Sequence, residues 1–406
     1  MNSDEKNTNN NLNKCVLLYS GGLDTSCCIK WIKEKYGYEV IALILDVGQK
    51  SKDFKMIKQR ALKIGAKDAI LVDAKNEFAN EYISKAIKAN ALYEGVYPMS
   101  AALSRPLIAK WAVNVAIKND AQAIAHGCTG KGNDQVRFDV TINTLYPKIK
   151  IIAPVREWNM SREEEIEYAK SRDIPLELDT NSIYSVDENV WGRSSECGPL
   201  EYPEKEPPKD LYGWITYPEN APDKSETLSL KFKKGIPVEL NNEKIELYEI
   251  ISKLNEIAGK HGVGIIDHME DRIIGLKSRE IYEAPAATVI MTAHKDLEKF
   301  VCTINENLFK PIIDNKWTEL AYSGLWLDPL MTSLESFINK INEKVEGEVI
   351  LKIYKGSVRV IGRSSKNALY NLKLATYDKG QTFNQNAAEG FIELYGLQTK
   401  MANNLK

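Results

Sequence analysis

Residues 17–26 read LLYSGGLDTS: an apolar run ends at a serine, and two glycines, an acidic residue and two hydroxyl-bearing residues follow. The apolar run predicts a strand, and the residues from Asp24 to Tyr36 have helical spacing. Gly21 and Gly22 lack the Cβ atoms that would hinder a sharp bend or the close approach of a ligand to the backbone. Because the first N–H groups of a helix attract anions, this strand–turn–helix segment predicts a phosphate-binding loop.

This loop differs from the two best-known phosphate-binding loops. It lacks the lysine of the Walker A sequence and the G-x-G-x-x-G spacing of dinucleotide-binding folds. Ser20, Thr25 and Ser26 can donate from their hydroxyls, and Asp24 can cap the helix or hold Mg²⁺. A turn without a ligand is the alternative for two glycines alone, but the polar residues around them favour binding. Basic groups would then come from elsewhere in the chain, and Lys131 is a candidate.

Strand and helix patterns alternate outward from the loop over about 160 residues. Strands are expected at residues 14–20, 38–47, 68–74, 122–126 and 149–155, and helices at residues 24–36, 52–64, 75–91 and 102–119 and after Ser161. Ser161 and Glu164 have the spacing of a capping box. This alternation predicts an α/β fold with a doubly wound parallel sheet, helices on both faces and a ligand at the carboxyl ends of the strands.

The composition changes from Gly198, where four prolines interrupt any periodicity. Beyond them we expect a strand at 226–235, helices at 245–262, 284–308 and 330–345, and a hairpin at 348–365 that turns at residues 355–357. The second domain is therefore predicted to be α+β with an antiparallel component. The last thirty residues have a helical pattern but too few neighbours to fold alone, so we expect them to dock on another subunit.

The bulk composition is that of a globular protein, with 43% hydrophobic and 27% charged residues, and 406 residues favour about two domains. A net charge of −2 gives no reason to expect a nucleic acid partner, and no apolar run is long enough for a membrane span. The polar, Asn-rich start predicts a disordered tail, not a signal peptide, and hence a cytoplasmic protein. Scattered cysteines and histidines predict neither a disulfide scaffold nor a zinc site.

A second informative stretch, HGCTGKGNDQVRFD, spans residues 126–139 directly after a predicted strand. Its glycines allow a close-approaching loop, and Thr129, Asn133, Asp134 and Arg137 place small polar and charged groups within nine residues. This mixture suits an amino acid, which needs donors for its carboxylate and a carboxylate for its ammonium. A solvated glycine-rich loop is the alternative interpretation.

The SGGLDTS segment resembles the PP-loop of the ATP pyrophosphatases, and HGCTGKGNDQVRF resembles a motif of the argininosuccinate synthase family. Further matches to that family run in order to about residue 395; they include ALYEGVYP (91–98), SVDENVWGRSSECG (185–198) and EDRIIGLKSREIYEAPAA (270–287). The resemblance implies that ATP and citrulline form a citrulline-adenylate and diphosphate, and that aspartate then displaces AMP to give argininosuccinate, a step of arginine biosynthesis or a urea-type cycle. It also implies a homotetramer, and Mg²⁺ is expected to accompany ATP.

The resemblance assigns site residues by position. Those expected to bind ATP are Leu18, Tyr19, Ser20, Gly21, Gly22, Leu23, Asp24, Thr25, Ser26, Leu45 and Gly127. Those expected to bind aspartate are Thr129, Asn133 and Asp134. Those expected to bind citrulline are Tyr97, Asn133, Arg137, Ser185, Ser194, Glu270 and Tyr282. Asp24, Asp134 and Arg137 are the candidate catalytic residues, and no protein side chain is assigned to a metal.

Three residues, in two parts of the chain, depart from the family pattern. Leu45 stands where the family often has alanine beside adenine, and Ala101 and Ala102 stand where it usually has a hydroxyl for citrulline. Either Ser100 or a water would then replace that donor, or the contact with citrulline would be weaker. Because Glu270 and Tyr282 come from the second half of the chain, the active site is expected between the domains.

The implied organisation is a disordered tail (residues 1–13), an ATP-binding PP-loop domain of HUP type (14–178), a synthetase and multimerisation domain (179–375) and a C-terminal oligomerisation arm (376–406). Three other functions compete with this interpretation. A tRNA-modifying PP-loop enzyme would be expected to have a basic surface, and an amidotransferase would need a glutaminase segment. A nucleotide sensor without activity would show an eroded motif, whereas Ser20, Asp24, Asn133 and Asp134 are all present.

Overall fold

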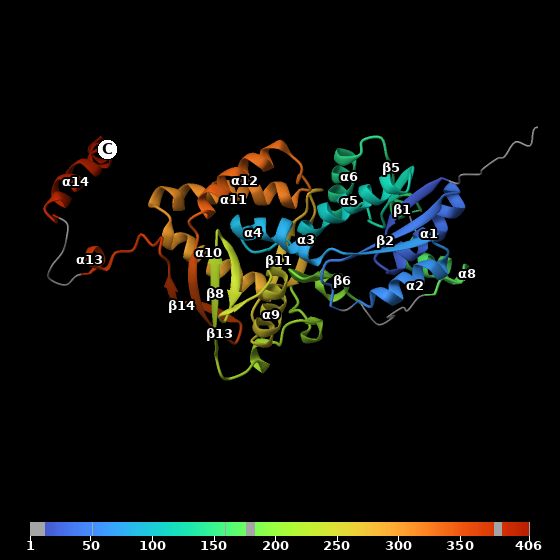
Figure 1. Cartoon of the computed structure of the whole chain (residues 1–406), viewed down its shortest axis with the longest axis horizontal. Helices are drawn as coiled ribbons and strands as arrows, with labels where there is room; N and C mark the ends of the chain where they lie inside the picture. The colour runs from blue at the N-terminus through green and yellow to red at the C-terminus, as the bar shows by residue number, and fades with distance from the viewer. Residues whose placement is uncertain (1–12, 51, 159, 176–182, 377–383, 406) are drawn as a thin grey trace, which may run out of the picture.

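The computed structural model describes residues 13–50, 52–158, 160–175, 183–376 and 384–405 (Figure 1). The predicted tail lies almost wholly outside these residues, as does the predicted boundary between residues 178 and 179. The N-terminal sheet and its helices lie at one end of the long axis, and the helix α14 lies at the other (Figure 1).

A five-stranded parallel sheet forms the N-terminal half, in the order β3-β2-β1-β4-β5. Its strands are β1 Lys14–Leu18, β2 Glu39–Asp46, β3 Asp68–Asp73, β4 Ala123–Ala125 and β5 Lys150–Ile152. Along β1, Cys15 and Leu17 belong to one apolar cluster, and Val16 and Leu18 belong to another. Successive side chains of a strand point to opposite faces, so both faces of this sheet are buried. The prediction of a doubly wound α/β fold is confirmed.

Helices cover the two faces of this sheet. One face packs against α1 Leu23–Tyr36, α2 Phe54–Ile64 and α8 Arg162–Ser171, and the other packs against α5 Ser100–Lys118 and α6 Asp134–Leu145. A short helix, α7 Pro154–Trp158, follows β5. The predicted capping box of α8 is present: the Ser161 side chain accepts from the Glu164 backbone, and the Glu164 side chain accepts from the Ser161 backbone.

The helical segment after β3 reaches into the second half of the molecule. It consists of α3 Lys75–Phe78, a π-helical turn η1 Ala79–Ile83 and α4 Ser84–Lys88. These short elements contact α9 Leu247–Lys260, α10 Pro285–Val301 and α12 Pro329–Asn342. In Figure 1, α4 accordingly lies among elements of the second half.

A five-stranded antiparallel sheet and four helices form much of the second half. Its strand order is β10-β9-β8-β13-β14, with β8 Glu226–Lys233, β9 Ile236–Leu240, β10 Glu243–Lys244, β13 Gly347–Tyr354 and β14 Ser357–Ser364. The predicted hairpin is β13–β14, and its turn holds Lys355 and Gly356 at φ 42° and 83°. Residues 198–225, which begin with the proline-rich stretch, contain only the short 3₁₀ turns η2 Gly198–Glu201, η3 Lys209–Leu211 and η4 Pro218–Asn220.

The helix expected at residues 284–308 is two helices. The first, α10, ends at Val301, and α11 Ile304–Tyr322 begins after Thr303, whose side chain forms a capping box with Glu306. The apolar pattern continues across this junction and hides it, whereas the cap residues mark the start of a new helix.

A four-stranded antiparallel sheet was not predicted. Its order is β11-β12-β7-β6, with β6 Ser185–Asn189, β7 Gly192–Glu196, β11 Ile265–Asp271 and β12 Lys277–Glu283. Beyond β14 the chain forms a short helix, α13 Leu372–Ala375, and then the predicted helical arm, α14 Ala387–Tyr395 and α15 Leu397–Asn404. The arm stands apart from the rest of the chain (Figure 1).

Candidate functional site

The glycine turn between β1 and α1 has the geometry that a phosphate-binding loop needs. Gly21 has φ 80°, and a Cβ on it would lie 3.0 Å from Ile57. Gly22 is the N-cap of α1, and no side chain caps this end of the helix. A Cβ on Gly127 would lie 2.9 Å from Thr25 Cγ2, so the absence of a side chain at Gly127 lets the loop after β4 pack against the turn.

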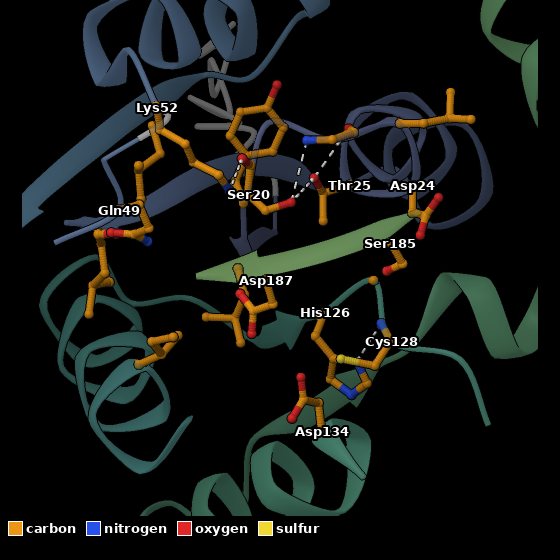
Figure 2. Close-up of a pocket in the computed structure, with 18 of the residues that line it drawn as sticks. Ser20, Asp24, Thr25, Gln49, Lys52, His126, Cys128, Asp134, Ser185 and Asp187 are labelled. Carbon is orange, nitrogen blue, oxygen red and sulfur yellow. Dashed lines mark hydrogen bonds between the residues drawn. The ribbon is translucent and has the colours of Figure 1, made fainter. Parts of the chain in front are cut away.

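A cavity of about 780 Å³ opens at the carboxyl ends of β1, β2 and β4 (Figure 2). We call it the first cavity. Nine of the eleven residues expected to bind ATP line it, namely Leu18, Tyr19, Ser20, Gly22, Leu23, Asp24, Thr25, Leu45 and Gly127. In Figure 2, Ser20, Thr25 and Asp24 lie on one side of it, and His126, Cys128 and Asp134 lie on the other. Its place at the strand ends is the one that ligands of parallel sheets occupy.

The other two predicted ATP residues lie elsewhere. Gly21 lines a second cavity and not the first. Ser26 lines neither: it is fully buried, and its Oγ lies 3.1 Å from the Tyr19 hydroxyl. The Ser26 hydroxyl therefore orients Tyr19 within the fold of the loop.

The second cavity has a volume of about 880 Å³ and lies between the two halves of the chain. It is lined by every residue expected to bind aspartate or citrulline, namely Tyr97, Thr129, Asn133, Asp134, Arg137, Ser185, Ser194, Glu270 and Tyr282. Four of them, Ser185, Ser194, Glu270 and Tyr282, belong to the four-stranded sheet. This unpredicted sheet is thus one wall of the candidate site.

Asp134 is held between two arginines at the floor of both cavities. Its Oδ2 accepts from Arg105 Nε at 2.9 Å, and its Oδ1 accepts from Arg137 Nη1 at 3.0 Å. Burial alone would raise the pKa of the Asp134 carboxyl, but Arg105 and Arg137 outweigh burial and lower it to about 2. Asp134 is therefore a carboxylate at any physiological pH. Arg105, which also pairs with Asp187, was not among the predicted residues.

Arg137 and Glu270 present opposite charges to the second cavity. Arg137 Nε donates to the Tyr322 carbonyl at 2.9 Å, while its Nη2 is buried without a hydrogen-bond partner. Glu270 is 3% exposed and accepts hydrogen bonds from the hydroxyls of Tyr282 and Tyr322. A free guanidinium nitrogen and a buried carboxylate in one cavity are complementary to the carboxylate and ammonium of an α-amino acid.

An acidic cluster continues along the same wall. Arg272 Nη2 lies 2.6 Å from Glu196 and 3.0 Å from Glu280. Burial, and after it the neighbouring Glu196 and Glu270, raise the pKa of Glu280 to about 8 despite Arg272. Arg272 Nη1 also donates to the Lys131 carbonyl at 3.2 Å, which ties the turn after β11 to the glycine-rich loop.

The cations beside the loop differ from the one suggested by sequence. The Lys131 residue is exposed and lines neither cavity, whereas Lys52 and Arg105 line both. Burial lowers the pKa of the Lys52 ammonium. Lys52 follows β2 in the chain, so only the fold brings it to the turn, where its Nζ donates to the Ser20 carbonyl at 3.2 Å.

The two alanines that depart from the family pattern have different surroundings. Ala101 lines the second cavity, and its N–H donates to the Tyr97 hydroxyl at 3.1 Å. Ala102 is fully buried in the apolar core. Ser100, the predicted replacement for the missing hydroxyl, is 3% exposed and lines neither cavity.

Metal-binding clusters and membrane-spanning helices are both absent from the described residues. Within them, His, Cys, Asp and Glu side chains do not gather in groups of three that could hold a metal ion. Every helix in that part of the chain is too short or too polar to cross a bilayer.

Comparisons with known proteins match both halves of the chain. The arginosuccinate synthase N-terminal HUP domain matches residues 14–175, and the arginosuccinate synthase C-terminal domain matches residues 184–402. A protein named argininosuccinate synthase from Pyrococcus furiosus is 55% identical, over 97% of this chain and 95% of its own length. A protein of the same name from Oceanobacillus iheyensis is 54% identical, over 96% of this chain and 93% of its own length. Another from Dehalococcoides mccartyi is 52% identical, over 97% of this chain and 97% of its own length.

Proposed function

The chain belongs to the argininosuccinate synthase family, and from this premise we propose how its residues share the family's reaction. The chain is an ATP-dependent ligase that joins citrulline and aspartate to form argininosuccinate, AMP and diphosphate, a step of arginine biosynthesis. The ureido oxygen of citrulline first bonds to the α-phosphorus of ATP, and diphosphate leaves. The aspartate amine then bonds to the ureido carbon, and AMP leaves with the C–O bond electrons.

We place ATP in the first cavity, with its β- and γ-phosphates on the glycine turn. The uncapped N-terminus of α1 offers N–H groups to them, and Lys52 and Arg105 supply positive charge nearby. Leu45 would pack against the adenine through its apolar side chain. Little proton transfer by the protein is needed, because alignment and charge stabilisation carry most of the catalysis of phosphoryl and nucleotidyl transfer.

We place both amino acids in the second cavity. Arg137, with its unpartnered Nη2, would bind the citrulline carboxylate, and Glu270 would bind the citrulline ammonium. Asp134 would hold the aspartate ammonium, with Thr129 and Asn133 beside it. Tyr97, Ser185, Ser194 and Tyr282 would complete the citrulline pocket.

The observation that carries this assignment is the wall that the two cavities have in common. Ten residues line both: Ser20, Gly22, Asp24, Lys52, Arg105, Gly127, Cys128, Asp134, Ser185 and Asp187. A nucleotide in one cavity and citrulline in the other would therefore meet along this wall. That contact is what attack of the ureido oxygen on the α-phosphorus requires.

We propose Mg²⁺ as the cofactor of ATP. Mg²⁺ keeps several waters and binds through one or two carboxylates together with substrate phosphates. Asp24, which lies in the first turn of α1 beside the glycine turn and lines both cavities, would hold it. When bound, the ion would neutralise charge on the phosphates.

We also propose a cytoplasmic homotetramer. The support is apolar surface that a single chain leaves uncovered: in the arm, Phe391, Ile392, Leu394 and Tyr395 are each more than 60% exposed. The extensive contact that α14 makes among the described elements is with the neighbouring helix α15. A second exposed apolar row, Ile304, Leu308 and Ile312, lies on α11. Neighbouring subunits would cover such surfaces.

The test is a product assay with Mg-ATP, citrulline and aspartate. We expect AMP, diphosphate and argininosuccinate in equal amounts, and labelled diphosphate should exchange into ATP only when citrulline is present. ADP and phosphate as products, or AMP formation that ignores citrulline, would contradict the assignment. Modification of a transfer RNA without citrulline would favour the tRNA-modifying alternative.

A further inference from the structure

Two stacked tyrosine pairs surround Glu270. The Tyr322 ring stacks on Tyr93 with centroids 3.4 Å apart and planes 4° apart, and the Tyr282 ring stacks on Tyr97 at 3.9 Å and 12°. Tyr93 and Tyr97 come from one tight turn, in which Tyr93 N donates to the Tyr97 carbonyl at 2.7 Å. The turn thus fixes two rings, and each ring supports a second tyrosine from a distant part of the chain.

The hydroxyls of the supported tyrosines bind the two oxygens of the Glu270 carboxylate. Tyr282 Oη donates to Oε2, and Tyr322 Oη donates to Oε1. Tyr322 Oη also accepts from Asn133 Nδ2 at 2.8 Å. The Asn133 amide is fixed from its other end, because its Oδ1 accepts from Ile273 N at 2.9 Å. The Asn133 Nδ2 group is therefore the donor to Tyr322, and the single hydroxyl proton of Tyr322 faces Glu270 Oε1 and, at 3.2 Å, the Asp271 carbonyl.

Tyr322 touches a third member of the second cavity. Its carbonyl accepts from Arg137 Nε, and its ring lies 4.8 Å from the Arg137 guanidinium. Two residues on, Gly324 has φ 77°, and a Cβ there would lie 2.9 Å from Arg137 Cα. The end of α11 is thus packed closely against the first turn of α6. Tyr322 itself is 1% exposed and lines neither cavity, so it acts only through its neighbours.

We infer that Tyr322 is the positioning residue of the citrulline site. Its hydroxyl orients Glu270 and Asn133 together, and its carbonyl and ring orient Arg137. The two charged groups proposed for the ammonium and the carboxylate of citrulline are thereby held at a fixed separation. This inference rests on the proposed placement of citrulline, and it adds a residue that the family resemblance did not assign.

The test is Tyr322→Phe, which keeps the ring and the carbonyl and removes the hydroxyl. Hydrogen bonds to a charged group contribute about 1.5–3 kcal/mol, so the KM for citrulline should rise roughly tenfold or more in citrulline-dependent exchange of diphosphate into ATP. The KM for ATP should change less than about twofold. Tyr82→Phe is the matched control, because Tyr82 is a buried tyrosine that is stacked on Trp326 at 4.8 Å and lines neither cavity. Removing its hydroxyl should leave the KM values for citrulline and ATP unchanged.

A substrate analogue separates positioning from general damage. Replacing citrulline by 5-ureidopentanoate removes the ammonium that Glu270 would bind. We expect the wild type to lose much activity on this replacement and Tyr322→Phe to lose less, because its Glu270 is already misaligned. An equal loss in both proteins, or a parallel rise in the KM values for ATP and citrulline, would overturn the inference. Absence of citrulline-dependent exchange in the wild type would instead contradict the proposed function.

Discussion

At the scale of single residues, the charge of Asp134 is set by its two arginine partners. A carboxylate with a pKa of about 2 is ready to bind an ammonium, but it is already paired with Arg105 and Arg137. An arriving aspartate ammonium must share it with them. Asp134 therefore connects the proposed aspartate site to Arg137 in the proposed citrulline site.

Asp134→Asn separates the two half-reactions. The amide oxygen can still accept from Arg137, but the charge for the aspartate ammonium is lost. We expect the KM for aspartate in argininosuccinate synthesis to rise roughly tenfold or more, with a smaller change in citrulline-dependent diphosphate exchange, which needs no aspartate. Equal losses in the two assays would show that Asp134 serves the first step just as much.

Glu280 should make folding stability depend on pH. Its pKa is raised from 4.5 to about 8, first by burial and then by Glu196 and Glu270. Between these pH values the folded state keeps a proton that the unfolded state releases, so this contribution is complete below about pH 4.5 and is lost as pH rises through about 8. Thermal unfolding of wild type and Glu280→Gln at pH 5 and 8.5 tests this. From pH 5 to pH 8.5 the wild type should lose more stability than Glu280→Gln. Equal losses in the two proteins would contradict a raised pKa of Glu280.

Sequence patterns predicted individual residues unevenly. Every residue that the family resemblance assigned to aspartate or citrulline lines one cavity. Arg105, Lys52 and Tyr322 were not predicted to belong to the site. Their roles depend on tertiary contacts: Lys52 follows a different strand from the glycine turn, and Tyr322 meets Asn133 across 189 positions of sequence. No local spacing signals such contacts.

At the scale of elements, the two sheets beside the site differ in how clearly the sequence predicts them. The parallel sheet is buried on both faces, so its strands are apolar runs that the sequence makes plain. The strands of the four-stranded sheet carry Ser185, Ser194, Glu270 and Tyr282, and these functional side chains interrupt the apolar alternation that identifies a strand. The wall of the site was therefore the part of the fold hardest to predict.

The glycine turn offers a test at this scale. Gly21→Ala places a Cβ at φ 80° against Ile57 and should cost about 1–2 kcal/mol of stability. Gly22 has φ −77°, and a Cβ on it would meet only Ser20 Oγ at 3.5 Å. The stability of Gly22→Ala should therefore be nearly that of the wild type. Its KM for ATP should nevertheless rise, because the new methyl group keeps phosphates from the backbone. Unfolding curves and ATP titrations of both variants would check this, and an unchanged KM in Gly22→Ala would place the phosphates elsewhere.

At the scale of the whole molecule, the arm exposes large apolar side chains that its own chain does not cover. Phe391 and Leu394 are 62% and 73% exposed on α14. A double change, Phe391→Asp with Leu394→Asp, should shift the protein from a tetramer to smaller species in sedimentation velocity. Lys400→Glu serves as the control, because it changes the charge of an exposed polar residue of the arm and removes no apolar side chain. This variant should leave the assembly intact. A tetramer that survives the double change would show that other surfaces hold it together.

The common wall of the two cavities has a consequence for the reaction intermediate. Citrulline-adenylate joins covalently the molecules that we place in the two cavities, so each end would be held while the other is momentarily free. Such bivalent attachment gives a released end a high effective concentration near its own site and makes escape of the whole molecule slow. The activated intermediate would thus remain bound until aspartate arrives. The two adjoining cavities in which it forms would also slow its release into solution.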